Sequence, residues 1–302
     1  MCKLNLQEGI LSLKKEQGAT ILAHNYQIPS IQDIADFLGD SLELSIKASK
    51  VEAQTIVFCG VTFMAETAKI LNPGKRVLVP RKDARCPMAD MATAEEIIEA
   101  RKEHPDAAVV AYVNTYAEVK AVADVCCTSA NAIKIVESID EDEIIFVPDM
   151  HLANYVASRT RKKIIPWEGY CYVHARILAS EVREAKRLHP DALLLVHPEC
   201  PADVIELADE VLSTGGMVRF ARESESREFL IGTEEGLLYR LSKENPGKMF
   251  MPAGTPRTCT SMKKITLADT YESLAQGRYE IELPDKVIAE AERSLRRMID
   301  LS

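Results

Sequence analysis

The sequence has no apolar run of about 18 or more residues, the length that a membrane-spanning helix needs. Its first residues, MCKLNLQEGILSLKKEQ, lack the basic region and apolar core of a secretion signal. Basic residues are also few, because 37 Lys and Arg face 46 Asp and Glu, a net charge of −9. A nucleic-acid-binding protein usually carries a basic patch. We therefore expect a soluble, cytoplasmic protein that has neither a membrane nor a nucleic acid as its partner.

The chain also lacks a low-complexity linker, so any subdivisions are expected to pack tightly. Its negative charge gives no general attraction for anions, and anionic substrates would need local binding groups. Eight cysteines are present. In a cytoplasmic chain they indicate metal or redox chemistry rather than a disulfide framework.

The most informative feature is an internal repeat. The tetrapeptide HPDA occurs at 104–107 and again at 189–192, an interval of 85 residues. Each copy opens an apolar run, AVVAYVNT or LLLVHPEC, and ATILAHNYQ lies 88 residues before the first of these. Self-similarity at a fixed period indicates repeated structural units. We expect three units, which are residues 1–84 together with 260–302, residues 85–169 and residues 170–259.

The order of apolar runs predicts an α/β fold. In each copy a helical pattern precedes a nearly continuous apolar, β-branched run, which is typical of a buried parallel strand. Further helices alternate with two more such runs in each copy, and this alternation predicts βαβ units with right-handed crossovers. The last segment, PDKVIAEAERSLRRMIDL, is strongly amphipathic and predicts a closing helix. Three copies of one unit can pack around a pseudo-threefold axis.

One cysteine per copy follows the repeat. Cys86, Cys171 and Cys259 are separated by 85 and 88 residues, so threefold packing would bring them to one point. Three protein ligands with an open fourth position are typical of a catalytic zinc site. An iron–sulfur cluster normally takes four thiolates, so three would leave one iron without a protein ligand. The alternative is that these cysteines are ordinary small core residues.

Polar side chains recur where ligands bind in such sheets, beyond the carboxyl ends of the strands. His24, Tyr112 and His197 end the first apolar run of each copy, and a Ser or Thr follows each of them after 17 residues. These residues, Ser41, Ser129 and Thr214, directly precede helical patterns. They could be ordinary helix N-caps. They could also bind anions, because a helix N-terminus has free N–H groups.

The chain resembles a known family, quinolinate synthase, along nearly its whole length. The matching segments are AHNYQ (23–27), GDS (39–41), FCGVTFMAETAKIL (58–71), CPMADM (86–91), YVNT (112–115), CTSANA (127–132), PDMHLANYV (148–156), WEGYCYVH (167–174), HPEC (197–200), STGGM (213–217) and CTSMK (259–263). The resemblance implies three Rossmann-like, three-layer α/β/α units around a pseudo-threefold axis. It implies a [4Fe–4S] cluster on Cys86, Cys171 and Cys259. It also implies that iminoaspartate and dihydroxyacetone phosphate condense to quinolinate, phosphate and two waters, in the de novo biosynthesis of NAD.

The resemblance also implies the substrate-binding residues, by their places in these motifs. They are His24 and Tyr26 of HNY, Ser41 of GDS, Tyr112 and Asn114 of YVN, Ser129 of CTSAN, His174 of WEGYCYVH, His197 and Glu199 of HPE, and Thr214 of STGGM. Of these, Glu199 is the candidate general base and Tyr26 the candidate proton shuttle. His197 is the next candidate base, and the histidines ordinarily titrate near neutrality. An aspartate oxidase or dehydrogenase is the expected source of iminoaspartate.

Two alternatives remain open from the sequence. The triplicated enzyme of diphthamide biosynthesis also carries three cysteines, but it would not share HNYQ, HPEC and STGGM. A non-catalytic zinc protein would use the cysteines only to clamp three domains. The remaining cysteines are expected to be structural; they are Cys2, Cys59, Cys126, Cys127 and Cys200.

Overall fold

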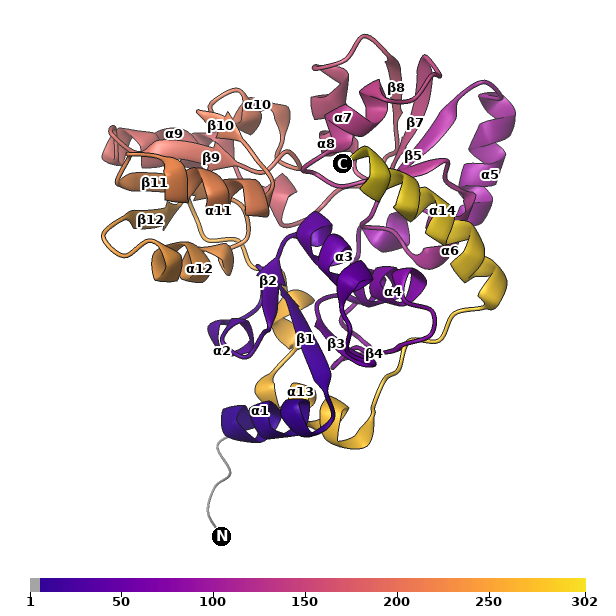
Figure 1. Ribbon diagram of the computed structural model, residues 1–302. Helices are drawn as coiled ribbons and strands as arrows, with labels where there is room; N and C mark the ends of the chain where they lie inside the picture. Colours follow the sequence, from indigo (N-terminus) through magenta and orange to yellow (C-terminus); the bar gives the residue numbers. More distant parts are fainter. Residues whose placement is uncertain (1–5) are drawn as a thin grey trace.

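The computed structural model describes residues 6–302, so Cys2 and the start of the segment inspected for a secretion signal lie outside the described part. Each of its three four-stranded sheets has the same strand order; the orders are β2-β1-β3-β4, β6-β5-β7-β8 and β10-β9-β11-β12. All pairings within the sheets are parallel. The predicted α/β fold of three similar units is confirmed, and Figure 1 shows the units around a common centre.

The elements follow one plan in each unit. The first sheet and its helices comprise α1 (Leu6–Glu16), β1 (Ala19–His24), α2 (Pro29–Gln32), β2 (Phe37–Gly39), α3 (Ser41–Lys50), β3 (Thr55–Cys59), α4 (Thr62–Leu71) and β4 (Arg76–Leu78). The second comprise α5 (Ala94–Glu103), β5 (Ala108–Tyr112), α6 (Ala117–Val122), β6 (Val125–Cys127), α7 (Ala132–Glu137), β7 (Glu143–Val147), α8 (Met150–Ala157) and β8 (Lys163–Pro166). The third comprise α9 (Ala179–Leu188), β9 (Leu193–Val196), α10 (Ala202–Ile205), β10 (Glu210–Val211), α11 (Thr214–Glu223), β11 (Glu228–Gly232), α12 (Leu237–Glu244) and β12 (Met249–Pro252).

A repeated Ala-Asp pair ties each first strand to its neighbours. The carboxylate of Asp36 accepts the N–H of Ile21 in β1 at 2.8 Å and pairs with Lys14 of α1 at 2.8 Å. The same contacts recur in the other two units; they are Asp124 with Val109 and Arg101, and Asp209 with Leu194 and Lys186. The sequence repeat is therefore retained where a side chain completes the hydrogen bonding of a buried strand.

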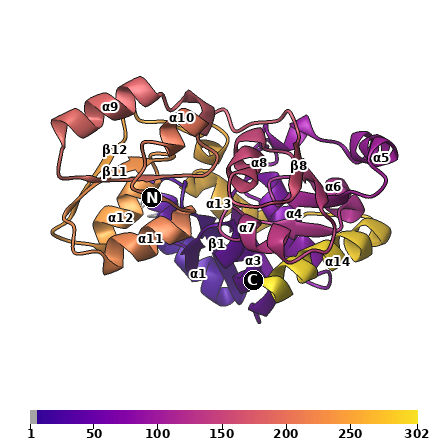
Figure 2. The same ribbon diagram turned by 90° about the horizontal axis from the view of Figure 1, so that it is seen from above.

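Two C-terminal helices follow the three sheets. The helix α13 (Leu267–Gln276) packs on α1 and β3 of the first unit. The amphipathic helix α14 (Asp285–Leu301) packs mainly on α6 and β6 of the second unit and also touches α4 of the first. Figures 1 and 2 show α14, in yellow, lying along the second unit beside α6. Its buried residues Ala291, Leu295 and Met298 belong to the same apolar core as β5 and β7.

Within residues 6–302, no helix is both long and apolar enough to span a membrane. The seven cysteines in this part of the chain are free thiols. Four of them, Cys59, Cys126, Cys127 and Cys200, are buried in the apolar cores of the sheets. The other three are the in-phase cysteines, and they lie in loops that follow the fourth strand of each sheet.

Candidate functional site

A central cavity lies where the three units meet, beyond the carboxyl ends of the strands. The space not filled by protein atoms, including the part open to solvent, is about 690 Å³. Every residue that the sequence placed in the site lines it; these are Cys86, Cys171 and Cys259 with His24, Tyr26, Ser41, Tyr112, Asn114, Ser129, His174, His197, Glu199 and Thr214. Among residues 6–302, no lysine or arginine lines this cavity.

The three in-phase cysteines share one local geometry. A 3-10 turn follows each of them; the turns span Ala89–Met91, His174–Arg176 and Met262–Lys264. In every case the backbone N–H three residues after the cysteine is hydrogen-bonded to its sulfur. Such N–H donors to sulfur stabilise a thiolate and tune a bound cluster. The other described cysteines lack this threefold arrangement.

Two buried carboxylates hold the loops of these cysteines. Asp149, two residues beyond the end of β7, accepts the N–H of Cys171 at 3.1 Å. Glu234, two residues beyond the end of β11, accepts the N–H of Cys259 at 3.0 Å. Both carboxylates are fully buried. We did not predict these two residues, although they are 85 residues apart and so follow the repeat interval.

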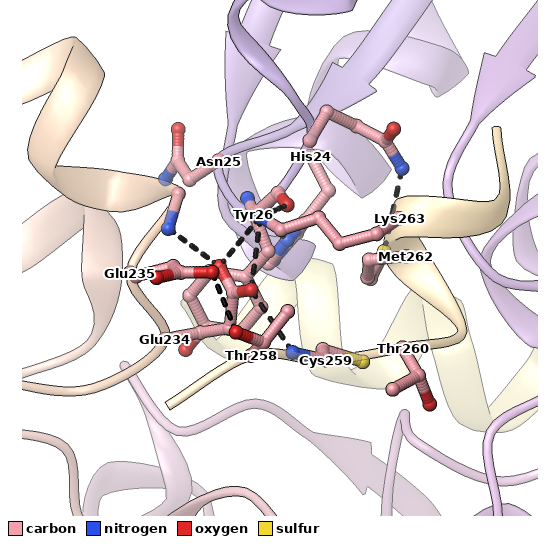
Figure 3. A network of polar contacts seen from close by, with 12 residues as sticks. His24, Asn25, Tyr26, Glu234, Glu235, Thr258, Cys259, Thr260, Met262 and Lys263 are labelled. Atoms are coloured by element: carbon pink, nitrogen blue, oxygen red, sulfur yellow. Dashed lines mark hydrogen bonds and ion pairs between the residues drawn. The ribbon is translucent and has the colours of Figure 1, made fainter. Parts of the chain in front are cut away.

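Glu234 also links the third cysteine loop to β1. Its two oxygens lie 2.9 Å and 3.0 Å from the Nζ of Lys263, and the same ammonium donates to the backbone oxygen of Tyr26 at 2.5 Å. Figure 3 shows Glu234 and Lys263 between Tyr26 and Cys259. The segment that carries Tyr26 is therefore held by Lys263, which is itself paired with Glu234.

Glu199 lies among polar side chains from two units. Its Oε2 is 2.6 Å from His174 Nδ1 and 3.3 Å from His197 Nδ1, and its Oε1 accepts from Asn114 Nδ2 at 3.5 Å. Burial opposes ionisation of Glu199, but His174 and His197 outweigh it and hold the pKa of Glu199 well below its usual value. Glu199 is therefore a carboxylate, the form that can accept a proton.

A threonine that we did not predict connects Tyr26 to this group. The hydroxyl of Thr233 lies 2.6 Å from Tyr26 Oη and 2.8 Å from His174 Nε2. Because His174 Nδ1 contacts Glu199, hydrogen-bonding distances run without a gap from Tyr26 to Glu199. Burial, aided by the charge of Glu199, raises the pKa of Tyr26 well above its usual value, so the phenol keeps its proton.

The three predicted hydroxyl residues point into the cavity and none of them is a helix N-cap. The caps of α3 and α11 are the preceding residues, Asp40 and Ser213, whose side chains accept backbone N–H groups. Ser129 lies before the start of α7 and is 3.1 Å from His197 Nε2. The hydroxyls of these residues are therefore available for a ligand, whereas the capping interactions belong to their neighbours.

The backbone N–H groups at the N-terminus of α11 are bound by protein side chains. The N–H of Gly215 donates to Asp40 Oδ2 at 3.2 Å, and a Cβ at Gly215 would lie 2.6 Å from the same oxygen. The N–H of Gly216 donates to Ser213 Oγ. The close backbone approach at Gly215 is thus to a carboxylate of the first unit, and hydroxyl groups are left to face a ligand.

Two cavity histidines are neutral near pH 7. Burial lowers the pKa of His24 to about 4, against a smaller opposing effect of Asp40. Burial also lowers the pKa of His197, with the nearby charge of Glu199 opposing. Both imidazoles therefore act near neutrality as uncharged hydrogen-bonding groups, contrary to the titration expected for a histidine with an unperturbed pKa.

The spacing of the thiols bears on which metal they could hold. Among the described residues, Cys171, His174 and Glu199 have ligand atoms that all lie within 4.8 Å of one another, and the three in-phase cysteines do not form such a set. A tetrahedral zinc ion, with Zn–S of about 2.3 Å, would hold its thiolates about 3.8 Å apart. The wider spacing fits a multi-atom cluster better than a single zinc ion.

Comparison with known proteins gives a consistent result. The family model described as "Quinolinate synthetase A protein" matches residues 8–300. The quinolinate synthase of Methanoregula boonei is 54% identical over 296 residues, which cover 98% of either chain. That of Pyrococcus furiosus is 53% identical over 299 residues, again 98% of either chain. That of Thermodesulfovibrio yellowstonii is 53% identical over 295 residues, 97% of either chain.

Proposed function

The chain belongs to the quinolinate synthetase A family and is an enzyme of that kind, and we propose that it forms quinolinate from iminoaspartate and dihydroxyacetone phosphate. The condensation releases one phosphate and two waters, which balances the atoms of the two substrates. The observation that supports this reading is the convergence of thirteen predicted side chains from three units on one cavity. Family membership argues against the diphthamide-type alternative.

We propose that Cys86, Cys171 and Cys259 hold a [4Fe–4S] cluster with one iron free of protein ligands. Their half-buried places on one cavity wall and their threefold N–H donors fit such a group. When bound, the cluster supplies a Lewis acid that polarises an oxygen or nitrogen of the substrate. The carboxylates of Asp149 and Glu234 would fix two of the ligand loops from behind.

Neutral donors would bind the two anionic substrates. The cavity is lined by Ser41, Ser129 and Thr214, with Tyr112 and Asn114, and no lysine or arginine from the described part of the chain lies at its wall. Burial raises the pKa of Tyr112 well above its usual value, so its phenol remains a donor. Hydrogen bonds from neutral groups to a charged oxygen are strong when water is excluded.

Proton transfers would be carried by Glu199 and Tyr26. Glu199, held as a carboxylate, can accept a carbon-bound proton from a substrate within hydrogen-bonding reach. Tyr26 can give a proton to a substrate oxygen and regain one through Thr233, since Thr233 also contacts His174. His197 stacks on His174 with ring centroids 4.5 Å apart, so it orients this group and is the second candidate base. His24 and His174 would complete the binding surface.

The substrates also indicate a functional partner. Iminoaspartate is an imine that water hydrolyses, so an enzyme that oxidises aspartate must supply it nearby. We propose an aspartate oxidase or an aspartate dehydrogenase in this role.

The test is an anaerobic assay on protein reconstituted with iron and sulfide. With iminoaspartate and dihydroxyacetone phosphate we expect quinolinate and phosphate in equal amounts. Protein loaded with zinc alone should be inactive. A colourless protein that retains stoichiometric zinc and no iron after anaerobic purification would contradict the cluster, and a cluster-loaded protein without quinolinate formation would contradict the reaction.

A further inference from the structure

Thr214 is bound from behind by an amide that belongs to another unit. Asn25 follows β1 in the first unit, and its Nδ2 donates to Thr214 Oγ1 in the third unit at 2.9 Å, in a fully buried contact. Arg240 of α12 donates from Nη1 to Asn25 Oδ1 at 2.7 Å. The same nitrogen also donates to the carbonyl of Leu38 at 3.0 Å, while Arg240 Nε pairs with Glu244 at 2.7 Å.

In these hydrogen bonds the donor and the acceptor are fixed by the chemistry of the three side chains. A guanidinium has donors and no acceptor, so the Asn25 atom that faces Arg240 must be the carbonyl oxygen. The other end of the amide is then the NH₂ group, which can only donate. Thr214 Oγ1 must therefore accept from Asn25. Its own hydrogen cannot point back toward the amide.

The Thr214 hydrogen is directed to the cavity instead. Thr214 lines the cavity, and no hydrogen bond donated by its hydroxyl is found within residues 6–302. The neighbouring N–H groups of Gly215 and Gly216 are already used by Asp40 and Ser213. At this end of the cavity the hydroxyl is thus a donor whose partner must come from a ligand.

The fold itself does not require this arrangement. The residues equivalent to Asn25 by the repeat intervals of 88 and 85 are Val113 and Pro198, and neither has an amide side chain. The second and third units nevertheless form the same sheet with the same strand order. The contact of Asn25 with Thr214 is therefore an addition to the first unit that serves the shared cavity.

We propose that Asn25 and Arg240 are positioning residues that fix the Thr214 hydroxyl as a donor to an anionic oxygen of the substrate. This inference rests on the proposed function, because it assigns a carboxylate or phosphate oxygen to the place in front of Thr214. Arg240 does not line the cavity, yet its charge polarises the Asn25 amide and, through it, the Thr214 hydroxyl. The site therefore selects ligand atoms that accept a hydrogen bond over those that donate one, and it does so without placing the charge of Arg240 at the cavity wall.

The experiment measures binding without turnover. Full-length protein, reconstituted anaerobically with its cluster, is titrated calorimetrically with succinate and, separately, with inorganic phosphate. Thr214→Val should weaken at least one probe about tenfold or more, the scale of one hydrogen bond to a charged group. Thr214→Ser keeps the hydroxyl and should stay within about threefold of the unaltered protein.

A double-mutant comparison isolates the positioning role. In Asn25→Asp both side-chain oxygens are acceptors, so the Thr214 hydroxyl turns to donate to the carboxylate. Thr214→Val should then cost less than about twofold in the Asn25→Asp background, against tenfold or more in the parent. The added negative charge does not affect this comparison, because the Asn25→Asp single variant and the Asn25→Asp, Thr214→Val double variant both carry it.

Arg240 variants provide the second arm. Arg240→Met frees the amide to rotate and should weaken the same probe about threefold to tenfold, while Arg240→Lys keeps a donor and should restore most of the affinity. Arg222→Met removes the same charge from exposed Arg222 on α11 and should change affinity less than about twofold. Melting temperature and iron content confirm that each variant is folded and loaded.

Three results would overturn the inference. They are an equal cost of Thr214→Val in both Asn25 backgrounds, unchanged affinities in a folded Arg240→Met protein, and a lack of binding of either probe to the unaltered protein. If Arg240→Met does not fold, the Asn25 and Thr214 comparison decides alone. A protein that shows the coupling but makes no quinolinate would refute the proposed function and leave this inference standing.

Discussion

Glu199 and Tyr26 differ in the charge that their surroundings favour. The two histidines beside Glu199 favour the carboxylate despite burial, whereas burial and the charge of Glu199 favour the neutral phenol of Tyr26. Two titratable groups whose environments push their pKa values apart are a common arrangement for a base and an acid. The geometry therefore supports one proton acceptor and one proton donor in the same cavity.

Tyr26→Phe and Glu199→Gln test these roles. Both variants keep the size of the side chain and remove the group that exchanges a proton. We expect kcat to fall at least about a hundredfold in each, which is the usual scale for losing a positioned acid or base. Iron content and the absorption spectrum should stay unchanged, because neither residue is a proposed cluster ligand. Near-normal turnover in Glu199→Gln would move the base to His197.

Thr233→Val tests the link between Tyr26 and His174. Valine keeps the shape of threonine but cannot bridge the phenol and the imidazole, so return of a proton to Tyr26 should slow. We expect kcat to fall about tenfold or more with a nearly unchanged KM, because the hydroxyl does not face the substrates. Thr233→Ser restores the bridge and should recover most of the rate. Equal kcat in the Val and Ser variants would show that Thr233 only fills space.

The sequence predicted much of this site because its residues lie at repeated intervals or in long motifs. It did not predict Thr233, which is buried one residue beyond β11 and has no counterpart of the same type in the other units. Nor could it predict that Asn25 contacts Thr214, since that contact joins residues 189 apart in the chain. Side-chain contacts between units depend on how the three units pack, and the spacing along one chain does not give that packing.

At the scale of elements, the junction of α4 and α6 contains half-buried Glu66 and fully buried Lys120. Glu66 of α4 accepts the N–H of Ala117 at the start of α6, at 2.9 Å. Burial raises the pKa of Glu66 to about 7 against the opposing effect of Lys120. Lys120 is fully buried near the ring of Phe63, and burial lowers its pKa to about 8. This junction joins the first unit to the second.

Glu66 should make stability depend on pH. Its folded pKa lies above its unfolded value of 4.5, so the folded protein binds the proton more tightly, and this stabilisation is lost as pH rises from about 4.5 to about 7. Glu66→Gln resembles the protonated form. The variant should match the parent at pH 5 and exceed it at pH 8 by about 1 to 3 kcal/mol of unfolding free energy.

Urea unfolding at the two pH values measures this difference. Glu95→Gln is the matched control, because Glu95 is an exposed carboxylate of α5 and should change stability by no more than about 0.5 kcal/mol at either pH. A gain for Glu66→Gln that is equal at pH 5 and pH 8 would show that its proton is not linked to folding.

For the C-terminal helices, the sequence predicts a helix but does not predict which unit each helix packs on. The amphipathic pattern of the last segment predicted α14 and its buried face, because an apolar stripe at helical spacing must pack against something. It did not indicate that α13 would pack on the first unit while α14 crosses to the second. The boundaries of the three units stay a prediction, since α14 contributes to the core of a sheet that lies far from it in the chain.

For the whole molecule, the threefold repeat has two kinds of consequence. Contacts that build each sheet are repeated, such as the carboxylates of Asp36, Asp124 and Asp209 on the first strands. The contacts around the cavity are not repeated, because a site for two different substrates has no need of threefold symmetry. The loop cysteines are the exception, since one follows the last strand of each sheet, with the same N–H donor three residues later.

The cysteines therefore give a prediction for the whole molecule. Replacing any one of Cys86, Cys171 and Cys259 by Ala should abolish the cluster absorbance and quinolinate formation together, since two thiolates hold a four-iron cluster poorly. The effect should be the same for all three, because each thiolate is proposed to bind one iron of the same cluster. Iron and sulfide content after anaerobic reconstitution measures the loss.

Cys127 is the matched control, because it is fully buried in the second unit and does not line the cavity. Cys127→Ala should lower stability somewhat, as loss of a small buried side chain does, and leave iron content and turnover largely intact. Loss of the cluster in Cys127→Ala together with its retention in Cys171→Ala would contradict the threefold assignment. In that case the cluster would depend on Cys127 of β6, and the metal centre would not lie where the three sheets meet.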